Sequence, residues 1–133
     1  MTKLIDKLAW LYLKDGELLA VRSIGKSLFY LPGGKREDGE SDEQALCREI
    51  NEELDVDLQP ETIRYAGTFT GPADGKADGV EVQLTCYFAD YEGTLSPEAE
   101  IEEMGYLSSQ DEAITSKAAW IAVEWLQSQG KLN

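Results

Sequence analysis

The sequence contains no histidine and only two cysteines, Cys47 and Cys86. Without histidine, catalysis by a Ser-His or Cys-His pair is excluded, and a Cys/His zinc site lacks its ligands. Two cysteines allow at most one disulfide, which is not a disulfide framework. Cys47 falls in a helical pattern and Cys86 in a strand pattern, so we expect two buried free thiols.

Basic residues are also scarce. Twelve Lys and Arg stand against 26 Asp and Glu, which gives a formal net charge of −14. Such a surface repels nucleic-acid backbones, so we expect no stable complex with DNA or RNA. It repels free polyphosphates too. A protein of this charge that handles phosphates therefore needs bound divalent cations to reverse the local field.

Long apolar segments are missing as well. No apolar run approaches the roughly 18 residues of a membrane span, and residues 1–7 contain no apolar core of a signal peptide. We therefore expect a cytoplasmic protein that does not contact membranes. The 133 residues, of which 42% are hydrophobic, fit a single domain over residues 1–133 with its own core.

Residue patterns predict strands and helices whose order indicates an α/β fold, with a mixed sheet packed between helices. Asp15-Gly16 is a hairpin turn signal, and Ser41 or Asp42 is a suitable N-cap for the first helix. The predicted strands are residues 8–13, 17–22, 28–31, 63–70, 80–91 and 104–107, and the predicted helices are 43–54 and 116–129. Pro32-Gly33-Gly34 ends the third strand, and loops are predicted at 35–41, 71–79 and 92–103.

The first predicted helix carries three glutamates on one face. Glu49, Glu52 and Glu53 are spaced i, i+3 and i+4, next to an apolar stripe of Leu46, Ile50 and Leu54. Like charges at this spacing repel, and a hard cation such as Mg²⁺ or Mn²⁺ offsets the repulsion because it prefers carboxylate oxygens. The alternative is a solvated acidic face.

The residues before and within this helix resemble the Nudix signature, a Gly, five residues, a Glu, seven residues, and then Arg-Glu-aliphatic-x-Glu-Glu-x-Gly-aliphatic. The match covers residues 34–56 through Gly34, Glu40, Arg48, Glu49, Ile50, Glu52, Glu53 and Val56. One position departs, because Asp55 replaces the last glycine. Asp adopts the left-handed conformation common at helix ends more readily than most residues, so we expect an intact site.

The resemblance implies a Nudix fold and metal-dependent hydrolysis of a phosphoanhydride bond by attack of water on phosphorus, with Mg²⁺ or Mn²⁺ as cofactor. It favours a pyrophosphohydrolase that releases a nucleoside monophosphate and pyrophosphate from a (d)NTP. The alternatives are an ADP-ribose or nucleotide-sugar pyrophosphatase, for which Pro72 is a weak indication, and a non-catalytic nucleotide sensor. The implied partner is thus a small nucleotide. The oligomeric state stays open, with a homodimer as one alternative.

The resemblance also implies roles for individual residues. Glu52 and Glu53 bind the metal, Glu49 is a ligand or the water-activating base, and the Gly33 carbonyl completes the metal shell. Glu40 and Arg48 form an ion pair that joins the loop to the helix. The acidic loop before the last strand supplies a further ligand, Glu103 or Glu100, unless it is only solvated. Substrate contacts are expected from Arg22, Gly34 and Lys35.

Two further features of the sequence bear on the ligand. At least one aromatic residue is expected to stack on a base, although each alone is favoured for the core; the candidates are Trp10, Tyr12, Tyr30, Phe69 and Tyr87. Residues 74–79 superficially suggest a calcium loop. Lys76 occupies a ligand position there, however, and Thr85 stands where a closing Glu is required, so we reject this interpretation.

Overall fold

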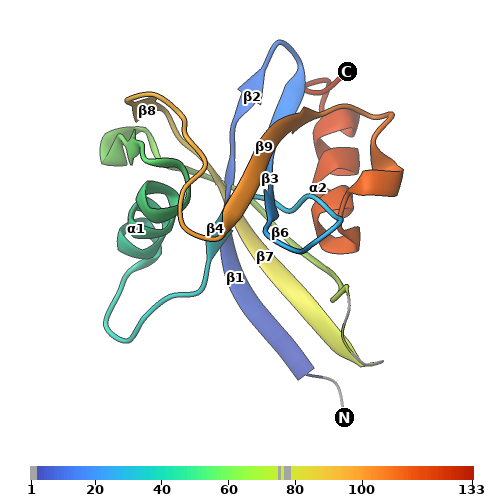
Figure 1. Ribbon diagram of the computed structural model, residues 1–133, viewed down its shortest axis with the longest axis horizontal. Coiled ribbons are helices and arrows are strands. Elements are labelled where there is room, and N and C mark those ends of the chain that lie inside the picture. Colours follow the sequence, from blue (N-terminus) through green and yellow to red (C-terminus); the bar gives the residue numbers. More distant parts are fainter. Residues whose placement is uncertain (1–2, 75, 77–78) are drawn as a thin grey trace.

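The computed structural model describes residues 3–74, 76 and 79–133. Figure 1 shows β-strands at the centre of the molecule, with helix α1 on one side and helix α2 on the other. The elements are β1 (Lys3–Leu11), β2 (Leu13–Lys14), β3 (Glu17–Ser23), β4 (Gly33–Gly34), α1 (Asp42–Leu54), β5 (Asp57–Leu58), η1 (Pro60–Thr62), β6 (Arg64–Pro72), β7 (Val80–Phe88), β8 (Tyr91–Glu92), β9 (Ile101–Leu107), η2 (Glu112–Ile114) and α2 (Lys117–Ser128).

The largest sheet has the strand order β4-β1-β7-β6. β1 runs parallel to β7, with Lys3 opposite Val80 at one end and Leu11 opposite Phe88 at the other. β4 and β6 pair antiparallel to β1 and β7, respectively, so the sheet is mixed. Because helices cover both faces of the sheet there, the C-terminal end of β1, Leu8–Leu11, is a continuous buried apolar run rather than an alternating one.

A second sheet, β2-β3-β9, stands beside the first. Its hairpin turns at Asp15 and Gly16, where the φ angles are 53° and 77°. Two successive left-handed residues match the right-handed twist of a hairpin, as the Asp-Gly pair predicts. β3 also pairs antiparallel with β9, so the acidic segment that precedes β9 lies beside the end of β3.

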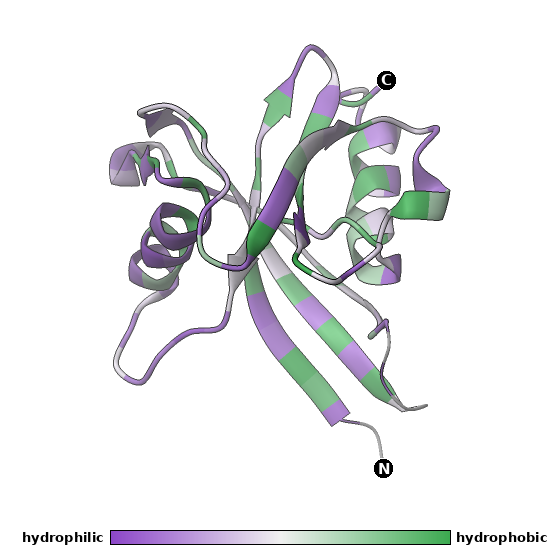
Figure 2. Cartoon of the chain, viewed as in Figure 1, coloured by the Kyte–Doolittle hydropathy of each residue, from purple (hydrophilic) through white to green (hydrophobic). Residues whose placement is uncertain are grey.

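Two hydrophobic cores lie on opposite sides of the central sheet. Leu46, Ile50 and Leu54 of α1 pack into one core with Trp10, whereas Leu126 of α2 belongs to the other. Figure 2 shows the matching pattern, with hydrophobic and hydrophilic residues alternating along β7 and hydrophilic residues prominent on α1. The predicted α/β class, with a mixed sheet between helices, is therefore confirmed.

Several predicted boundaries were wrong. β1 begins at Lys3 because pairing with β7 extends it beyond its apolar run. Residues 28–31 make only isolated bridges, whereas Gly33 and Gly34, predicted to end a strand, form β4 against β1. β9 begins at Ile101, inside the predicted acidic loop. The predicted loop 71–79 overlaps β6, and part of it, residues 75, 77 and 78, lies outside the described residues.

Two simpler expectations concern the thiols and membrane spans. Cys86 is buried, Cys47 is half-buried, and both are free thiols. Within the described ranges, no helix combines the length and apolar character needed to cross a membrane.

Candidate active site

The local sequence determines where α1 begins and ends. Ser41 is its N-cap: the Ser41 hydroxyl accepts a hydrogen bond from the Gln44 amide, and the Gln44 side chain accepts one from the Ser41 amide. Such caps stabilise a helix by about 1 kcal/mol. At the other end Asp55 has φ 58° and ψ 32°, which is the left-handed conformation expected where the signature carries glycine.

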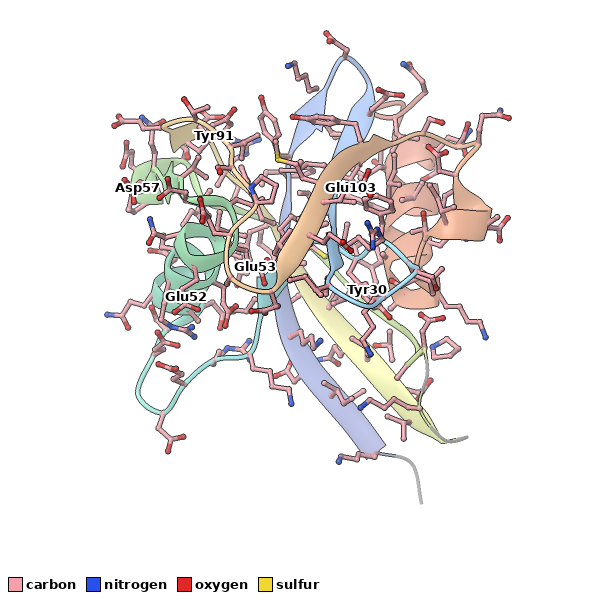
Figure 3. All side chains as sticks on the ribbon, in the orientation of Figure 1. Tyr30, Glu52, Glu53, Asp57, Tyr91 and Glu103 are labelled. Carbon is pink, nitrogen blue, oxygen red and sulfur yellow. The ribbon has the colours of Figure 1, made fainter. Side chains whose placement is uncertain are left out.

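The three glutamates of α1 lie in different surroundings. Glu53 is buried, with 8% of its surface exposed. The side chain of Glu49 is 18% exposed, whereas that of Glu52 is 53% exposed. The labelled side chains of Glu52 and Glu53 are seen in Figure 3. One turn of helix therefore places one carboxylate in the interior, one at its margin and one in solvent.

Arg48 joins α1 to the loop that precedes it. Its guanidinium donates to both carboxylate oxygens of Glu40, at 2.8 and 2.9 Å, and to the Lys35 carbonyl at 3.1 Å. It also donates to Glu49 at 3.0 Å and to Glu52 at 3.4 Å. Hydrogen bonds from Arg48 lower the pKa of Glu40 to about 2. The structure thus brings together the predicted pair of Glu40 and Arg48.

A second arginine attaches the same loop to the sheet, which the sequence did not indicate. Arg36 donates to Asp6 of β1 at 2.8 Å and also pairs with Asp42 in the first turn of α1. The hydroxyl of Tyr87, from β7, donates to Asp42 at 2.5 Å. Asp6 and Arg36 are 30 positions apart and Asp42 and Tyr87 are 45 apart, so no short sequence motif indicates these contacts. The network was therefore visible only in the structure.

Gly33 and Gly34 let the loop backbone approach closely on both sides. Gly33 has φ 148°, and a Cβ there would overlap the Leu8 carbonyl oxygen of the neighbouring strand. A Cβ on Gly34 would lie 2.5 Å from the Glu49 carboxylate. The Gly33 amide donates to Glu53 Oε1 at 3.1 Å, so this glycine contacts the buried carboxylate through its N–H. Only glycine allows this packing.

A cavity of about 540 Å³ opens beside these groups, within the range of small-molecule sites. On the α1 side its lining includes Glu49, Glu53 and Glu100 together with Lys7 and Lys35. The side of α2 and the β6–β7 connection contributes a different set of lining residues, namely Tyr30, Pro72, Asp74, Ser116 and Ala118. The cavity therefore has one end with three carboxylates, here called the charged end, and one end near α2 with a single carboxylate, Asp74; Lys26 and Lys76 also line the cavity.

The carboxylates at the charged end are poorly compensated. Burial, with added repulsion from Glu49 and Glu100, raises the pKa of Glu53 to about 8, although the Gly33 amide and Lys7 oppose the rise. Burial also raises the pKa of Glu49, against the effect of Arg48. Burial and the neighbouring Lys35 lower the pKa of Lys7. Burial therefore disfavours the charged form of each of these groups. A bound cation would stabilise the charged glutamates, and a bound anion would stabilise the charged Lys7.

These residues fit a divalent cation by their chemistry. Carboxylate oxygens are the preferred ligands of Mg²⁺ and Mn²⁺, and Glu53 is a buried carboxylate whose one hydrogen-bond donor among the described residues is the Gly33 amide. Across the described residues, however, no three acidic or thiol side chains already converge on one point. Arg48 accounts for part of this spread, because it holds Glu49 and Glu52 by hydrogen bonds.

Some predicted site residues are not brought to the cavity. Arg22 donates to Glu103 at 3.0 and 3.2 Å and to Glu102 at 2.8 Å, which pairs β3 with β9 on the surface. Neither Arg22 nor Glu103 lines the cavity, whereas Ser23, Glu100 and the predicted Gly34 and Lys35 do. The β-bulge between Arg22 and Ser23 changes the alternation of side chains there, and a sequence pattern does not reveal such a bulge.

The candidate aromatic residues differ in whether they line the cavity. Trp10 is fully buried and donates its indole N–H to the Ala89 carbonyl, and Phe69 packs against Trp125. Tyr87 belongs to the Arg36 network. Among the described residues, Tyr30 is the only aromatic side chain that lines the cavity. Sequence reasoning missed Lys7 and Asp74 as lining residues, because an isolated charge on a strand or loop carries no distinguishing signal.

Comparisons with known proteins agree with this fold. A model of the NUDIX domain family matches residues 6–131. The Escherichia coli ORF135 protein is 24% identical, with 96% of this chain and 94% of that chain covered and a TM-score of 0.71. A MutT NUDIX hydrolase from Burkholderia pseudomallei is 24% identical, with 92% and 97% covered and a TM-score of 0.74.

A third solved structure is a bifunctional NMN adenylyltransferase/ADP ribose pyrophosphatase from Francisella tularensis, complexed with AMP and a Mn ion. It is 19% identical, with 97% of this chain and 42% of that chain covered and a TM-score of 0.64. At such identities, the three structures show a shared fold and no more. The comparison with curated proteins gives no match.

Proposed function

The chain belongs to the NUDIX family of hydrolases, and from this premise we propose that it hydrolyses a phosphoanhydride bond of a nucleoside triphosphate, releasing a nucleoside monophosphate and pyrophosphate. One observation carries the proposal: the buried Glu53 lines a nucleotide-sized cavity beside Glu49 and Glu100, with Lys7 and Lys35 on the same wall. Carboxylates suit a cation and the lysines suit phosphate oxygens.

The proposed cofactor is Mg²⁺ or Mn²⁺, held by Glu52, Glu53 and the Gly33 carbonyl, as the signature implies, with Glu49 as a further ligand or as the base that activates the water. Glu100 is the proposed ligand from the segment before β9, in place of Glu103, because Glu100 lines the cavity. When bound, such a cation lowers the pKa of a reacting water and neutralises charge on the leaving phosphate.

The protein's own groups have distinct proposed tasks. Glu49 accepts the proton of the attacking water through Oε2, because its Oε1 already accepts a hydrogen bond from Arg48. Arg48 and Glu40 hold the loop so that Gly34 and Lys35 stay at the cavity wall. Lys7 and Lys35 bind the phosphate chain and orient it toward the carboxylates.

A second candidate reaction is the cleavage of ADP-ribose or a nucleotide sugar. Pro72, the residue that weakly indicated this reaction from sequence, lines the cavity. The Francisella tularensis protein of the same fold is an ADP ribose pyrophosphatase as well as an adenylyltransferase. Both reactions break a phosphoanhydride bond at the same carboxylates, so the products distinguish them.

The test is a panel of nucleoside triphosphates, ADP-ribose and nucleotide sugars, each incubated with the purified protein in Mg²⁺, in Mn²⁺ or in EDTA. Mass spectrometry of the products separates a monophosphate plus pyrophosphate from a monophosphate plus a sugar phosphate. We expect turnover of at least one triphosphate that EDTA abolishes. Tight binding without turnover across the whole panel would instead support the sensor alternative.

Glu53→Gln is the decisive variant, because it keeps the shape of the side chain and its hydrogen bond from the Gly33 amide but removes the charge. We expect turnover to fall by about 10²-fold or more, with an unchanged circular dichroism spectrum. Glu52→Gln is expected to lower turnover as well. Near-normal rates in both variants would show that the proposed metal site is wrong.

A further inference from the structure

The end of the cavity near α2 contains a carboxylate that the proposed hydrolysis does not use. Asp74, in the connection between β6 and β7, lines the cavity together with Tyr30. Its Oδ2 accepts a hydrogen bond of 2.9 Å from the Lys117 amide, the first residue of α2. Figure 3 shows Tyr30 toward the α2 side of the view and Glu53 toward the α1 side.

Two amides in the first turn of α2 already donate hydrogen bonds within the protein, which makes this helix end less able to bind phosphate. Asp74 takes the Lys117 amide, and the Ser116 hydroxyl accepts from the Ala119 amide at 3.2 Å. The negative charge of Asp74 would also repel a phosphate group placed here. Lys26 and Lys76 also line the cavity, but Asp74 and the hydrogen-bonded amides of α2 favour an uncharged part of the ligand at this end, so that the phosphate chain extends toward Lys7 and Lys35.

The surface around Asp74 suits a flat heterocycle. Tyr30 is half-buried and offers the only aromatic ring among the described lining residues, and Val82, Leu84 and Ala118 add apolar walls. Burial and the nearby charge of Asp74 raise the pKa of Tyr30, so the phenol stays neutral. An aromatic face with apolar walls and one acceptor is the usual composition of a base-binding pocket.

We propose that Asp74 is a specificity-determining residue, whose carboxylate accepts a hydrogen bond from an exocyclic amino group of the nucleobase. Asp74 Oδ1 has no partner among the described residues and serves as the acceptor. A carboxylate is only an acceptor, so it favours a base edge that donates over one that presents a carbonyl oxygen. The inference rests on the proposed nucleotide hydrolysis and deepens it.

The experiment compares two pairs of nucleotides: GTP against ITP, which lacks the 2-amino group, and CTP against UTP, which has a carbonyl oxygen in place of the amino group and a ring N–H beside it. The wild-type protein is expected to prefer the amino-bearing member of at least one pair by about tenfold to a hundredfold in kcat/KM. Asp74→Asn keeps an oxygen for the Lys117 amide but places an NH₂ group toward the ligand. We expect this variant to lose most of the preference, or to reverse it.

Two further variants separate specificity from general binding. Tyr30→Leu removes the aromatic face, so KM should rise several-fold for both members of a pair while their ratio stays unchanged. Asp90→Asn changes an exposed aspartate outside the cavity and should alter neither value. If Asp74→Asn leaves the amino preference intact, or if the wild-type protein shows none in either pair, the proposal is overturned.

Binding measurements keep this result distinct from a failure of the proposed hydrolysis. Calorimetric titration with non-hydrolysable analogues of the same nucleotide pairs, in Mg²⁺, reports recognition without turnover. A protein that binds with the Asp74-dependent preference but does not hydrolyse any panel member would support the inference and refute the hydrolysis. Absence of both binding and turnover for every nucleotide would overturn both.

Discussion

The two ends of the cavity each contain a carboxylate, but the structure treats them differently. At the α1 end, Glu53 is 8% exposed, accepts one hydrogen bond from the Gly33 amide and lies near two more glutamates. At the α2 end, Asp74 accepts a hydrogen bond from the first amide of α2, where the helix dipole favours a negative charge.

This contrast indicates what each end binds. Burial opposes ionisation of Glu53 and raises its pKa to about 8, and an added cation would stabilise the ionised carboxylate, so the α1 end is suited to a cation. The charge of Asp74 is already stabilised by the protein, so its end needs no counter-ion and is suited to a neutral donor. The net charge of −14 repels free polyphosphates, and a cation bound at the α1 end would offset that repulsion.

The largest effect that tests this contrast between Glu53 and Asp74 is expected from Glu53→Gln, which removes the buried carboxyl from the metal-free protein. The folded-state pKa of Glu53 is about 8, against an ordinary value of 4.5. Between these pH values the folded state keeps a proton that the unfolded state releases, so the free energy of unfolding falls as pH rises from 4.5 through 8. Glu53→Gln removes this dependence and should be the more stable protein by a few kcal/mol at pH 9, and nearly equal at pH 4.5.

Urea unfolding in EDTA across this pH range measures the effect. Glu52→Gln is the matched control, because the Glu52 side chain is 53% exposed and solvent stabilises its charge. Its stability relative to wild type should change by no more than about 0.5 kcal/mol with pH. If the difference in unfolding free energy between Glu53→Gln and wild type does not grow with pH, the buried Glu53 charge does not destabilise the folded protein.

A smaller effect is expected from Arg48→Lys. Lysine keeps the charge, but its three donors on one nitrogen cannot replace the five hydrogen bonds of the Arg48 guanidinium, so the loop and the proposed base lose their alignment. We expect kcat to fall by about tenfold to a hundredfold with KM changed less. Arg64→Lys, at the start of β6 and outside the cavity, serves as the control. Equal rates for the two variants would contradict a positioning role for Arg48.

The smallest effect is expected from Arg22→Ala. The sequence suggested that Arg22 contacts phosphate, but the structure pairs it with Glu102 and Glu103 on the surface, outside the cavity. We therefore expect KM for the best substrate to change by less than about threefold, as measured by steady-state kinetics. A tenfold increase would mean that Arg22 leaves its carboxylate partners to bind substrate.

The elements that were predicted well are those whose signal is local. α1 begins after Ser41 and ends at Leu54, with Asp55 as the left-handed C-cap, as capping chemistry indicated, and the Asp15-Gly16 turn has the expected left-handed residues. Strand ends were predicted less well. β1 extends to Lys3 through pairing with a strand about 80 positions away, and Gly33–Gly34 becomes a strand only because β1 lies beside it.

The sequence alone determined the family, the helix that carries Glu49, Glu52 and Glu53, and the pairing of Arg48 with Glu40, because these depend on residues within a few turns of one another. Only the tertiary structure decided that Glu53 is buried and Glu52 exposed, and that Glu100 rather than Glu103 reaches the cavity. It also brought Asp74 to α2. Burial and long-range contact depend on how distant segments pack, and neither side-chain type nor spacing along the chain encodes that packing.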